Sequence, residues 1–174
     1  MITQLKMNTL EIQSVLKSDS MVAPILYGVF PIDHLPNIVS KPAALVINLD
    51  SSKKPGSHWV CIYFNRKGGC DYFDSYGKSP NKKLEKYMLK YATKINTNKK
   101  PVQLPFTSTC GQLCIFFLVW RARHVPQAMV MSGLDNSYAD EFVTGFVNKL
   151  FRINTVTFDE NFIVNQISKK YKSK

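Results

Sequence analysis

The sequence predicts an α+β fold in which a small, mainly antiparallel sheet packs against helices. Three apolar segments of strand length follow one another between residues 43 and 77, with turn-rich stretches between them. Two longer segments, residues 80–95 and the chain that begins at Cys110, have apolar patterns typical of helices. Strands and helices that occupy separate parts of the chain indicate this fold class.

The predicted strands lie close together in the chain. AALVINLD (43–50) and HWVCIYFN (58–65) are nearly continuous apolar runs, which is typical of buried neighbouring strands. A turn at RKGG (66–69) leads into a third candidate, CDYFDSYG (70–77), so we expect a three-stranded meander. Upstream, residues 24–42 contain four prolines and a glycine and are expected to form an ordered but irregular loop.

Helices are expected on both sides of these strands. Residues 5–17 keep an imperfect helical period, and CGQLCIFFLVWRARH (110–124) predicts a buried helix. A last helix is expected at 137–151, followed by a tail, about 166–174, that frays. The clearest helix is residues 80–95, where apolar side chains recur at helical spacing: Leu84, Tyr87, Met88, Tyr91 and Ile95.

Length and composition fit a single domain over residues 1–174. The apolar share of 45% supplies one sizeable core. The longest apolar runs are far shorter than the roughly 20 residues that cross a bilayer, and the N-terminus lacks the apolar core of a signal peptide. We therefore expect no membrane association, an intracellular location and four reduced cysteines. The net charge of +11 favours a polyanionic partner.

Residues suited to thiol chemistry stand at the ends of the predicted elements. His58 begins one strand, Asp74 ends the next, and Cys110 begins the buried helix. Antiparallel neighbours bring the start of one strand beside the end of the next, so His58 and Asp74 can face each other. The positive end of the helix dipole and a nearby imidazolium favour a thiolate at Cys110. We expect the carboxylate to accept from Nδ1 of His58, which leaves Nε2 to face the sulfur.

Other interpretations of these residues remain open. Cys110 could be a small core residue, which is the default for a single cysteine. The C-x3-C spacing that starts there is a poor match to a zinc site, so no metal is expected. Asp71 competes with Asp74, but the two have opposite parity on a strand and only one can face the histidine. Trp59 can fill the core or wall a substrate channel.

These motifs resemble those of the adenovirus protease (adenain) family, in the clan that includes the SUMO-specific proteases. The matching segments are SHWV (57–60), DYFDSYG (71–77) and QLPFTSTCGQLCIFFL (103–118). Family members place the catalytic histidine before a tryptophan, the acid in an aromatic-Asp/Glu-x-x-Gly segment, and a glutamine seven residues before Cys-Gly. The resemblance, which covers about residues 8–125, implies a catalytic triad of His58, Asp74 and Cys110.

The resemblance also implies a papain-like fold permuted in sequence. In it, the Gln103 side-chain amide and the Cys110 backbone N–H would form the oxyanion hole, and Trp59 would wall a narrow substrate channel. The implied protein is a cysteine endopeptidase that cleaves viral precursor proteins at glycine-containing sites during virion maturation. It would come from a related DNA virus or a virus-like transposon and act in the virion and the host cell interior, in the nucleus or a viral factory.

The same resemblance bears on partners. Adenovirus proteases use DNA as a cofactor, so DNA is a candidate activator here. A disulfide-linked activating peptide is not expected, because no cysteine lies between Cys70 and Cys110; a non-covalent peptide stays open, and a monomer is expected. The two alternative functions are a SUMO- or ubiquitin-type isopeptidase and a non-catalytic DNA-binding module. The basic residues proposed to contact DNA are Lys53, Lys54, Lys82, Lys83, Lys99, Lys100, Arg121 and Arg123.

Overall fold

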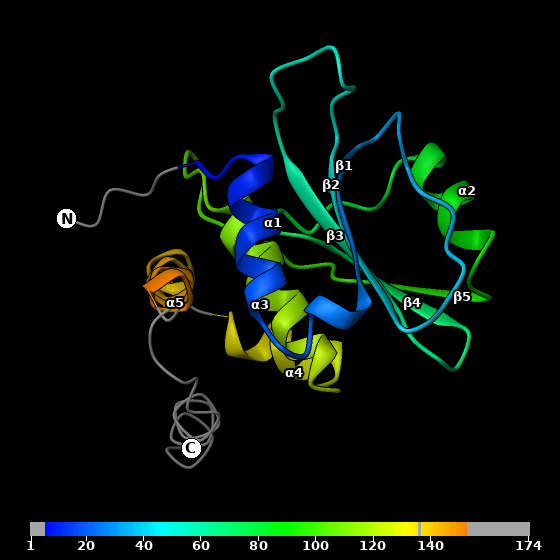
Figure 1. Cartoon of the computed structure of the whole chain (residues 1–174). Coiled ribbons are helices and arrows are strands. Elements are labelled where there is room, and N and C mark those ends of the chain that lie inside the picture. The colour runs from blue at the N-terminus through cyan, green and yellow to red at the C-terminus, as the bar shows by residue number, and fades with distance from the viewer. Residues whose placement is uncertain (1–5, 136, 153–174) are drawn as a thin grey trace.

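The computed structural model describes residues 6–135 and 137–152 of the chain. Their elements form one five-stranded sheet with helices on both faces (Figure 1). Within these residues, no helix has the length and apolarity that a membrane span requires. In chain order the elements are α1 (Thr9–Ser18), the 3-10 turn η1 (Ala23–Ile25), β1 (Leu26–Pro31), β2 (Ala43–Asn48), β3 (Trp59–Phe64), β4 (Gly69–Asp74), α2 (Lys82–Leu89), β5 (Lys94–Thr97), α3 (Cys110–Ala122), α4 (Gln127–Gly133) and α5 (Ala139–Arg152).

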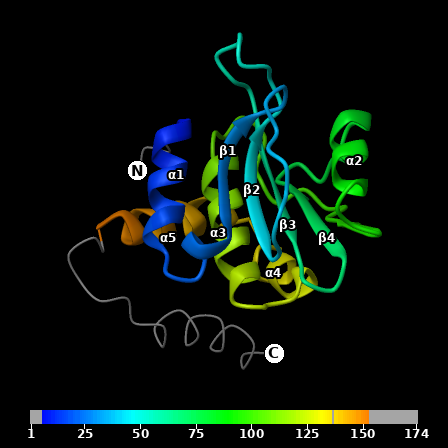
Figure 2. The same ribbon diagram turned by 45° about the vertical axis from the view of Figure 1, so that its right-hand side comes forward.

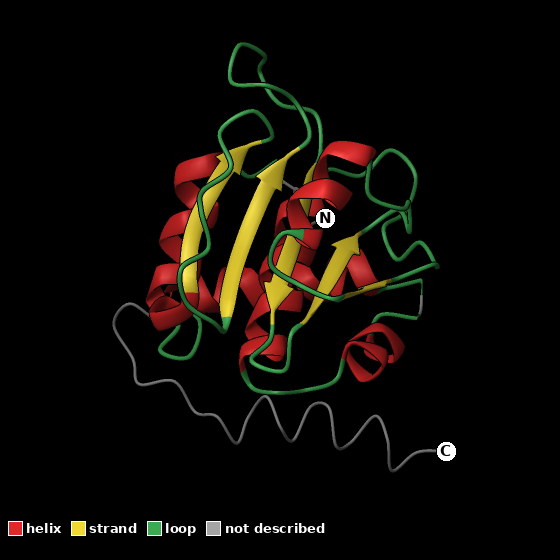
Figure 3. Ribbon diagram, turned by 90° about the vertical axis from the view of Figure 1, so that its right-hand side faces the viewer, coloured by secondary structure: helices red, strands yellow, loops and turns green. Residues whose placement is uncertain are grey.

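The sheet has the strand order β1-β2-β3-β4-β5 (Figure 3). Its centre is the predicted meander, in which β2, β3 and β4 pair antiparallel. Both edge strands pair parallel to their neighbours, so the whole sheet is mixed. The antiparallel centre matters for the site, because it sets the start of β3 beside the end of β4.

Both edge strands differ from the sequence prediction. β1 lies inside the segment expected to be an irregular loop; Gly28 allows a register shift there, and the chain still pairs with β2. The predicted helix 80–95 ends at Leu89, and Ile95 belongs to β5. The chain leaves the helix because the N–H of Thr93 bonds the carbonyl of Gly68, at 2.8 Å, and draws the next residues alongside β4.

The other predicted helices form with small shifts of their ends. α1 begins one residue after Asn8, whose side chain forms a reciprocal capping box with Glu11. α3 and α5 match the segments expected from residues 110 and 137, whereas the short helix α4 was not predicted. The expectation of a fraying tail at about 166–174 falls outside the described residues.

The helices divide the core between the two faces of the sheet. α1, α3, α4 and α5 cover one face and α2 covers the other, as the turned view shows (Figure 2). α3 lies against β3 and is surrounded by α1, α4 and α5, so every one of its residues except Arg121 is buried. Helix α3 is thus a central core element, and its first residue, Cys110, has a position fixed by that packing.

Candidate active site

His58 and Asp74 meet where β3 starts and β4 ends. The antiparallel register pairs Val60 with Asp74, which brings the residue just before β3 alongside the last residue of β4. Nε2 of His58 lies 2.9 Å from Oδ1 of Asp74. The Asp74 side chain is only 1% exposed and the His58 side chain 14%. The pair is therefore held by the sheet and largely removed from water.

The ring nitrogen that meets the acid differs from the expectation. Asp74 bonds Nε2 of His58, not Nδ1, so the expected roles of the two nitrogens are wrong. His58 directly precedes β3, and its Nε2, the ring nitrogen farther from the backbone, reaches Asp74 at the end of β4. Nδ1, the nitrogen nearer the backbone, is left for the sulfur.

The segment that carries Asp74 is fixed by further hydrogen bonds. Asn98 accepts from the backbone N–H of Asp74 at 3.0 Å and donates to its carbonyl at 2.6 Å. Oδ1 of Asp74 also accepts from the N–H of Tyr76 at 2.8 Å. The Tyr76 ring stacks on the His58 ring with centroids 5.0 Å apart. Gly77 then turns the chain with φ of 68°, where a side chain would meet the backbone of Lys100.

Asp71 faces away from the histidine. Its carboxylate pairs with Nε of Arg121 at 2.7 Å and accepts from Asn96 at 2.8 Å. The opposite parity of positions 71 and 74 explains the difference. Of the two acids, only Asp74 is placed to orient His58.

Cys110 supplies the sulfur of this arrangement. It is the first residue of α3, follows the N-cap Thr109 and is 4% exposed. Burial alone would lower the pKa of His58, but hydrogen bonds with Asp74 and Cys110, together with attraction to both groups, raise it from 6.5 to about 9. The imidazole therefore carries a proton at neutral pH.

Gln103 is held beside these groups by Ser75, the residue after Asp74. The hydroxyl of Ser75 donates to Oε1 of Gln103 at 2.6 Å, and the carbonyl of Ser75 accepts from the N–H of Gln103 at 3.1 Å. Nε2 of Gln103 donates to the carbonyl of Thr107 at 2.8 Å. A primary amide has two N–H groups, so this bond uses one and leaves the second for another acceptor.

Trp59 has a structural bond and also borders a cavity. Its Nε1 donates to the carbonyl of Met7 at 3.1 Å, and the side chain is 5% exposed. The cavity next to it has a volume of about 470 Å³, and more of its lining is apolar than polar. It is lined by Lys6, Met7, Asn8, Thr9, Pro31, Asn48, Asp50, Ser51, Ser52, Lys54, Pro55, Gly56 and Trp59.

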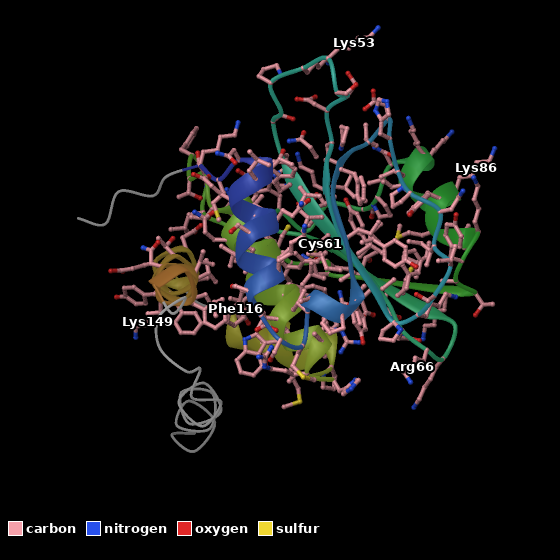
Figure 4. All side chains as sticks on the ribbon, viewed as in Figure 1. Lys53, Cys61, Arg66, Lys86, Phe116 and Lys149 are labelled. Atoms are coloured by element: carbon pink, nitrogen blue, oxygen red, sulfur yellow. The ribbon has the colours of Figure 1, made fainter. Side chains whose placement is uncertain are left out.

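Two of the basic residues expected to contact DNA serve inside the protein instead. Arg121 pairs with Asp71 and lies over the Tyr63 ring, and Arg123 pairs with Asp19 at 3.0 Å. Both side chains are less than 15% exposed, at 12% and 14%, so their assignment as DNA contacts is wrong. The lysines come from different segments: Lys53 lies on the loop between β2 and β3 (Figure 4), whereas α2 carries Lys82 and Lys83.

Sequence patterns singled out the four candidate site residues but gave no sign of the residues that bond or stack on them. Ser75, Asn98 and Tyr76 each bond or stack on a site residue, yet no local motif marks them. Ser75 had the strongest available signal, since it directly follows the acid in the matching segment DYFDSYG. The four cysteines are all unpaired, as expected, and Cys114 is buried one helical turn below Cys110.

Comparisons with known proteins identify similar sequences, and both described below are viral proteases. A cysteine protease of African swine fever virus is 29% identical over 120 residues, which are 62% of this chain and 43% of that protein. A protease of bovine adenovirus C serotype 10 is 26% identical over 102 residues, which are 49% of this chain and 52% of that protein. The chain thus spans about half the length of the curated relatives it matches.

Solved structures show the same fold. The crystal structure of the African swine fever virus protease aligns with a TM-score of 0.58 and 20% identity, over 83% of this chain and 67% of that one. The SUMO protease Ulp1 aligns with a TM-score of 0.51 and 18% identity, over 82% of this chain and 75% of that one. The family model described as adenovirus endoprotease matches residues 27–171. The chain therefore belongs to the adenovirus endoprotease family.

Proposed function

We propose that this chain is a cysteine endopeptidase with Cys110 as nucleophile, His58 as acid–base group and Asp74 as the acid that orients His58. The observation that carries the proposal is the convergence of three elements: the start of β3, the end of β4 and the N-terminus of α3. This convergence gives the raised pKa of His58, which depends on both Asp74 and Cys110. Groups arranged in this way are those that thiol catalysis requires.

The proposed reaction begins when the Cys110 thiolate attacks the scissile carbonyl and forms a C–S bond. The oxyanion accepts from the second amide N–H of Gln103 and from the backbone N–H of Cys110, which as the first helical residue has no partner within its own helix. The His58 imidazolium then gives its proton to the leaving nitrogen as the C–N bond breaks. Water, deprotonated by His58, hydrolyses the thioester and releases the thiolate.

The proposed substrates are viral precursor proteins cut at glycine-containing sites during virion maturation, inside the virion or an infected cell. Relatives from African swine fever virus and an adenovirus are both proteases of DNA viruses, which supports a viral substrate. Trp59 directly follows His58 in the chain, and the cavity that it lines contains none of the proposed catalytic residues, so its role in narrowing the substrate channel rests on the family resemblance. Glycine lacks a side chain, so a Gly-containing segment fits a passage narrowed by an indole.

The alternative function is removal of SUMO or ubiquitin from other proteins. One relative from African swine fever virus carries the name SUMO-1 cysteine protease, and the fold matches a SUMO protease. Both functions use the same triad, so the substrate decides between them. Reaction with a ubiquitin-type or SUMO-type vinyl sulfone, compared with cleavage of short glycine-containing viral peptides, separates the two.

The decisive experiment on the enzyme itself compares turnover with thiol labelling. Iodoacetamide at pH 6 should alkylate Cys110 far faster than the other thiols, because burial raises the pKa of Cys70 to about 12 and that of Cys114 well above its usual range. Cys110→Ala should abolish peptide cleavage, with Cys70→Ala as the control that keeps it. Wild-type rates in Cys110→Ala would refute Cys110 as the nucleophile. Equal labelling of all the cysteines together with no peptide cleavage would show that the protein is a non-catalytic module.

DNA is proposed as an activator through the exposed lysines, not through Arg121 or Arg123. Binding should weaken as salt rises, with a slope set by the number of phosphates neutralised. Fluorescence anisotropy with a short duplex measures this slope, and a flat response would remove DNA as a partner. A non-covalent activating peptide is tested by adding candidate viral peptides to the same cleavage reaction.

A further inference from the structure

Asp140 in the first turn of α5 holds the loop that runs from Gln103 to Cys110. The Asp140 side chain is nearly inaccessible, with the residue 2% exposed. Its Oδ2 accepts from the backbone N–H of Leu104 at 2.7 Å. Its Oδ1 accepts from the hydroxyl of Thr109 and lies 3.1 Å from the hydroxyl of Thr107, whose single proton is shared with the carbonyl of Leu104 at 2.9 Å. One carboxylate thus contacts three points of a six-residue loop.

This loop has little regular structure to hold it. It belongs to no helix or strand. Phe106 within it has a backbone φ of 67°, a value that residues other than glycine rarely adopt. Its two ends carry the oxyanion donors, the Gln103 amide and the Cys110 N–H. Packing of α3 holds Cys110, and Ser75 holds one side of the Gln103 amide, so the loop between the two donors is the part that other groups must hold.

A chain of hydrogen bonds links Asp140 to the Gln103 amide. Asp140 fixes the hydroxyl of Thr107, and the carbonyl of Thr107 accepts from Nε2 of Gln103 at 2.8 Å. That bond and the Ser75 bond to Oε1 together set the rotation of the amide and so the direction of its second N–H. At the other end, Asp140 bonds Thr109, the N-cap residue that directly precedes Cys110.

We propose that Asp140 is a positioning residue for the oxyanion hole, which holds the Gln103 amide and the Cys110 N–H so that both point at one spot. The inference rests on the proposed function. A carboxylate suits this task because it only accepts hydrogen bonds and can serve three donors at once. Its charge is placed in the first turn of α5, where the helix dipole stabilises it.

A purely structural role for Asp140 predicts something different. If the carboxylate only anchored α5 to the rest of the core, its loss would lower stability and disturb every reaction of Cys110 alike. A role in the oxyanion hole affects only reactions that form an oxyanion. Alkylation by iodoacetamide forms none, whereas peptide hydrolysis and reversible binding of a peptide aldehyde both place an oxygen in the hole.

The test measures all three reactions in Asp140→Asn, with Glu141→Gln as the control, because Glu141 is the exposed neighbour on the same helix turn. In Asp140→Asn, kcat should fall about tenfold to a hundredfold, less than the ~10²–10³ lost with an oxyanion donor itself. Affinity for a peptide aldehyde should fall by the same factor, since the adduct resembles the transition state. The alkylation rate of Cys110 should stay within about twofold, and Glu141→Gln should match the wild type throughout.

A second comparison separates action through Gln103 from independent action. In a Gln103→Ala background, Asp140→Asn should cost little more, because coupled residues are not additive. Thr107→Val removes one bond to Asp140 at a half-buried site and replaces Asp140→Asn in the test if that variant fails to fold. It should lower turnover and aldehyde affinity by a smaller factor and leave alkylation of Cys110 unchanged.

Each outcome decides the matter. Unchanged turnover in Asp140→Asn, an equal fall in alkylation and turnover, or full additivity with Gln103→Ala overturns the positioning role and leaves the proposed function intact. A wild-type protein that neither cleaves peptides nor shows selective alkylation of Cys110 overturns the proposed function and this inference with it.

Discussion

The acid–base half and the oxyanion half of the site are held in different ways. His58 and Asp74 stand at the ends of paired strands, where the ladder between β3 and β4 fixes their separation. Gln103 and Cys110 are joined by a loop that side chains from other segments hold in place, among them Ser75 and Asp140. The oxyanion half can therefore be disturbed by single substitutions that leave the sheet and its core intact.

The largest effect is expected from Asp74→Ala. Without the acid, the imidazole loses its fixed orientation, and kcat/KM should fall on the order of 10³–10⁴-fold. Alkylation of Cys110 at neutral pH should slow as well, since the attraction that keeps His58 protonated is lost. Kinetics with a fluorogenic peptide and timed iodoacetamide labelling measure both. Asp135→Asn, at an exposed acid, is the control.

Gln103→Ala should affect only one of these readouts. Turnover should fall on the order of a hundredfold or more, about 3 kcal/mol, through loss of an oxyanion donor. Alkylation of Cys110 should stay close to the wild-type rate. If Asp74→Ala and Gln103→Ala changed both readouts in the same proportion, the division of the site into two halves would be refuted.

Ser75→Ala tests a residue that joins the two halves, since it follows Asp74 and bonds Gln103. Ser75 is fully buried, and its loss deprives Oε1 of Gln103 of a donor. Stability should fall by about 1–3 kcal/mol, the usual cost of a buried polar group left unsatisfied, and turnover by about tenfold, part of the effect of a lost oxyanion donor. Urea unfolding and peptide kinetics measure the two effects. Ser18→Ala, which removes a hydroxyl bonded at the end of α1, should leave turnover unchanged.

The smallest effect is a pH dependence assigned to the acid–base half. His58 must be protonated to release the leaving nitrogen, and its pKa is raised to about 9. The protonated form is present below this pH and is lost above it, so kcat/KM should decline on the alkaline side of about pH 9. Asp74→Asn should move this limb to lower pH, whereas Gln103→Ala should leave it in place. A limb that moves only in Gln103→Ala would contradict the assignment.

The parts of the fold that sequence could predict are those with a strong local pattern. β2, β3 and α3 are continuous apolar runs, and each forms where expected. β1 was missed because its glycine and prolines suggest a loop, although backbone pairing with β2 holds it as an edge strand. β5 was missed because Ile95 continued the apolar stripe of α2 in the sequence.

The candidate site also has residues that sequence could predict and residues that it could not. His58, Asp74, Gln103 and Cys110 stand in short motifs, so sequence could nominate them. The partners that hold them come from distant positions: Asn98 bonds Asp74 across 24 residues, and Asp140 bonds Leu104 across 36. Single hydrogen bonds over such separations leave no periodic pattern. The choice between Nδ1 and Nε2 likewise depends on ring orientation, which no sequence pattern records.

The burial of α3, at every residue except Arg121, makes the molecule a reporter on its own unfolding. Cys110 stands at the entrance of this helix and Cys114 one turn deeper, where it is wholly inaccessible. A thiol reagent can reach the first in the native state but reaches the second only when the central helix is exposed. The ratio of the two labelling rates should therefore give the frequency with which the core opens, and the measurement needs no engineered cysteine.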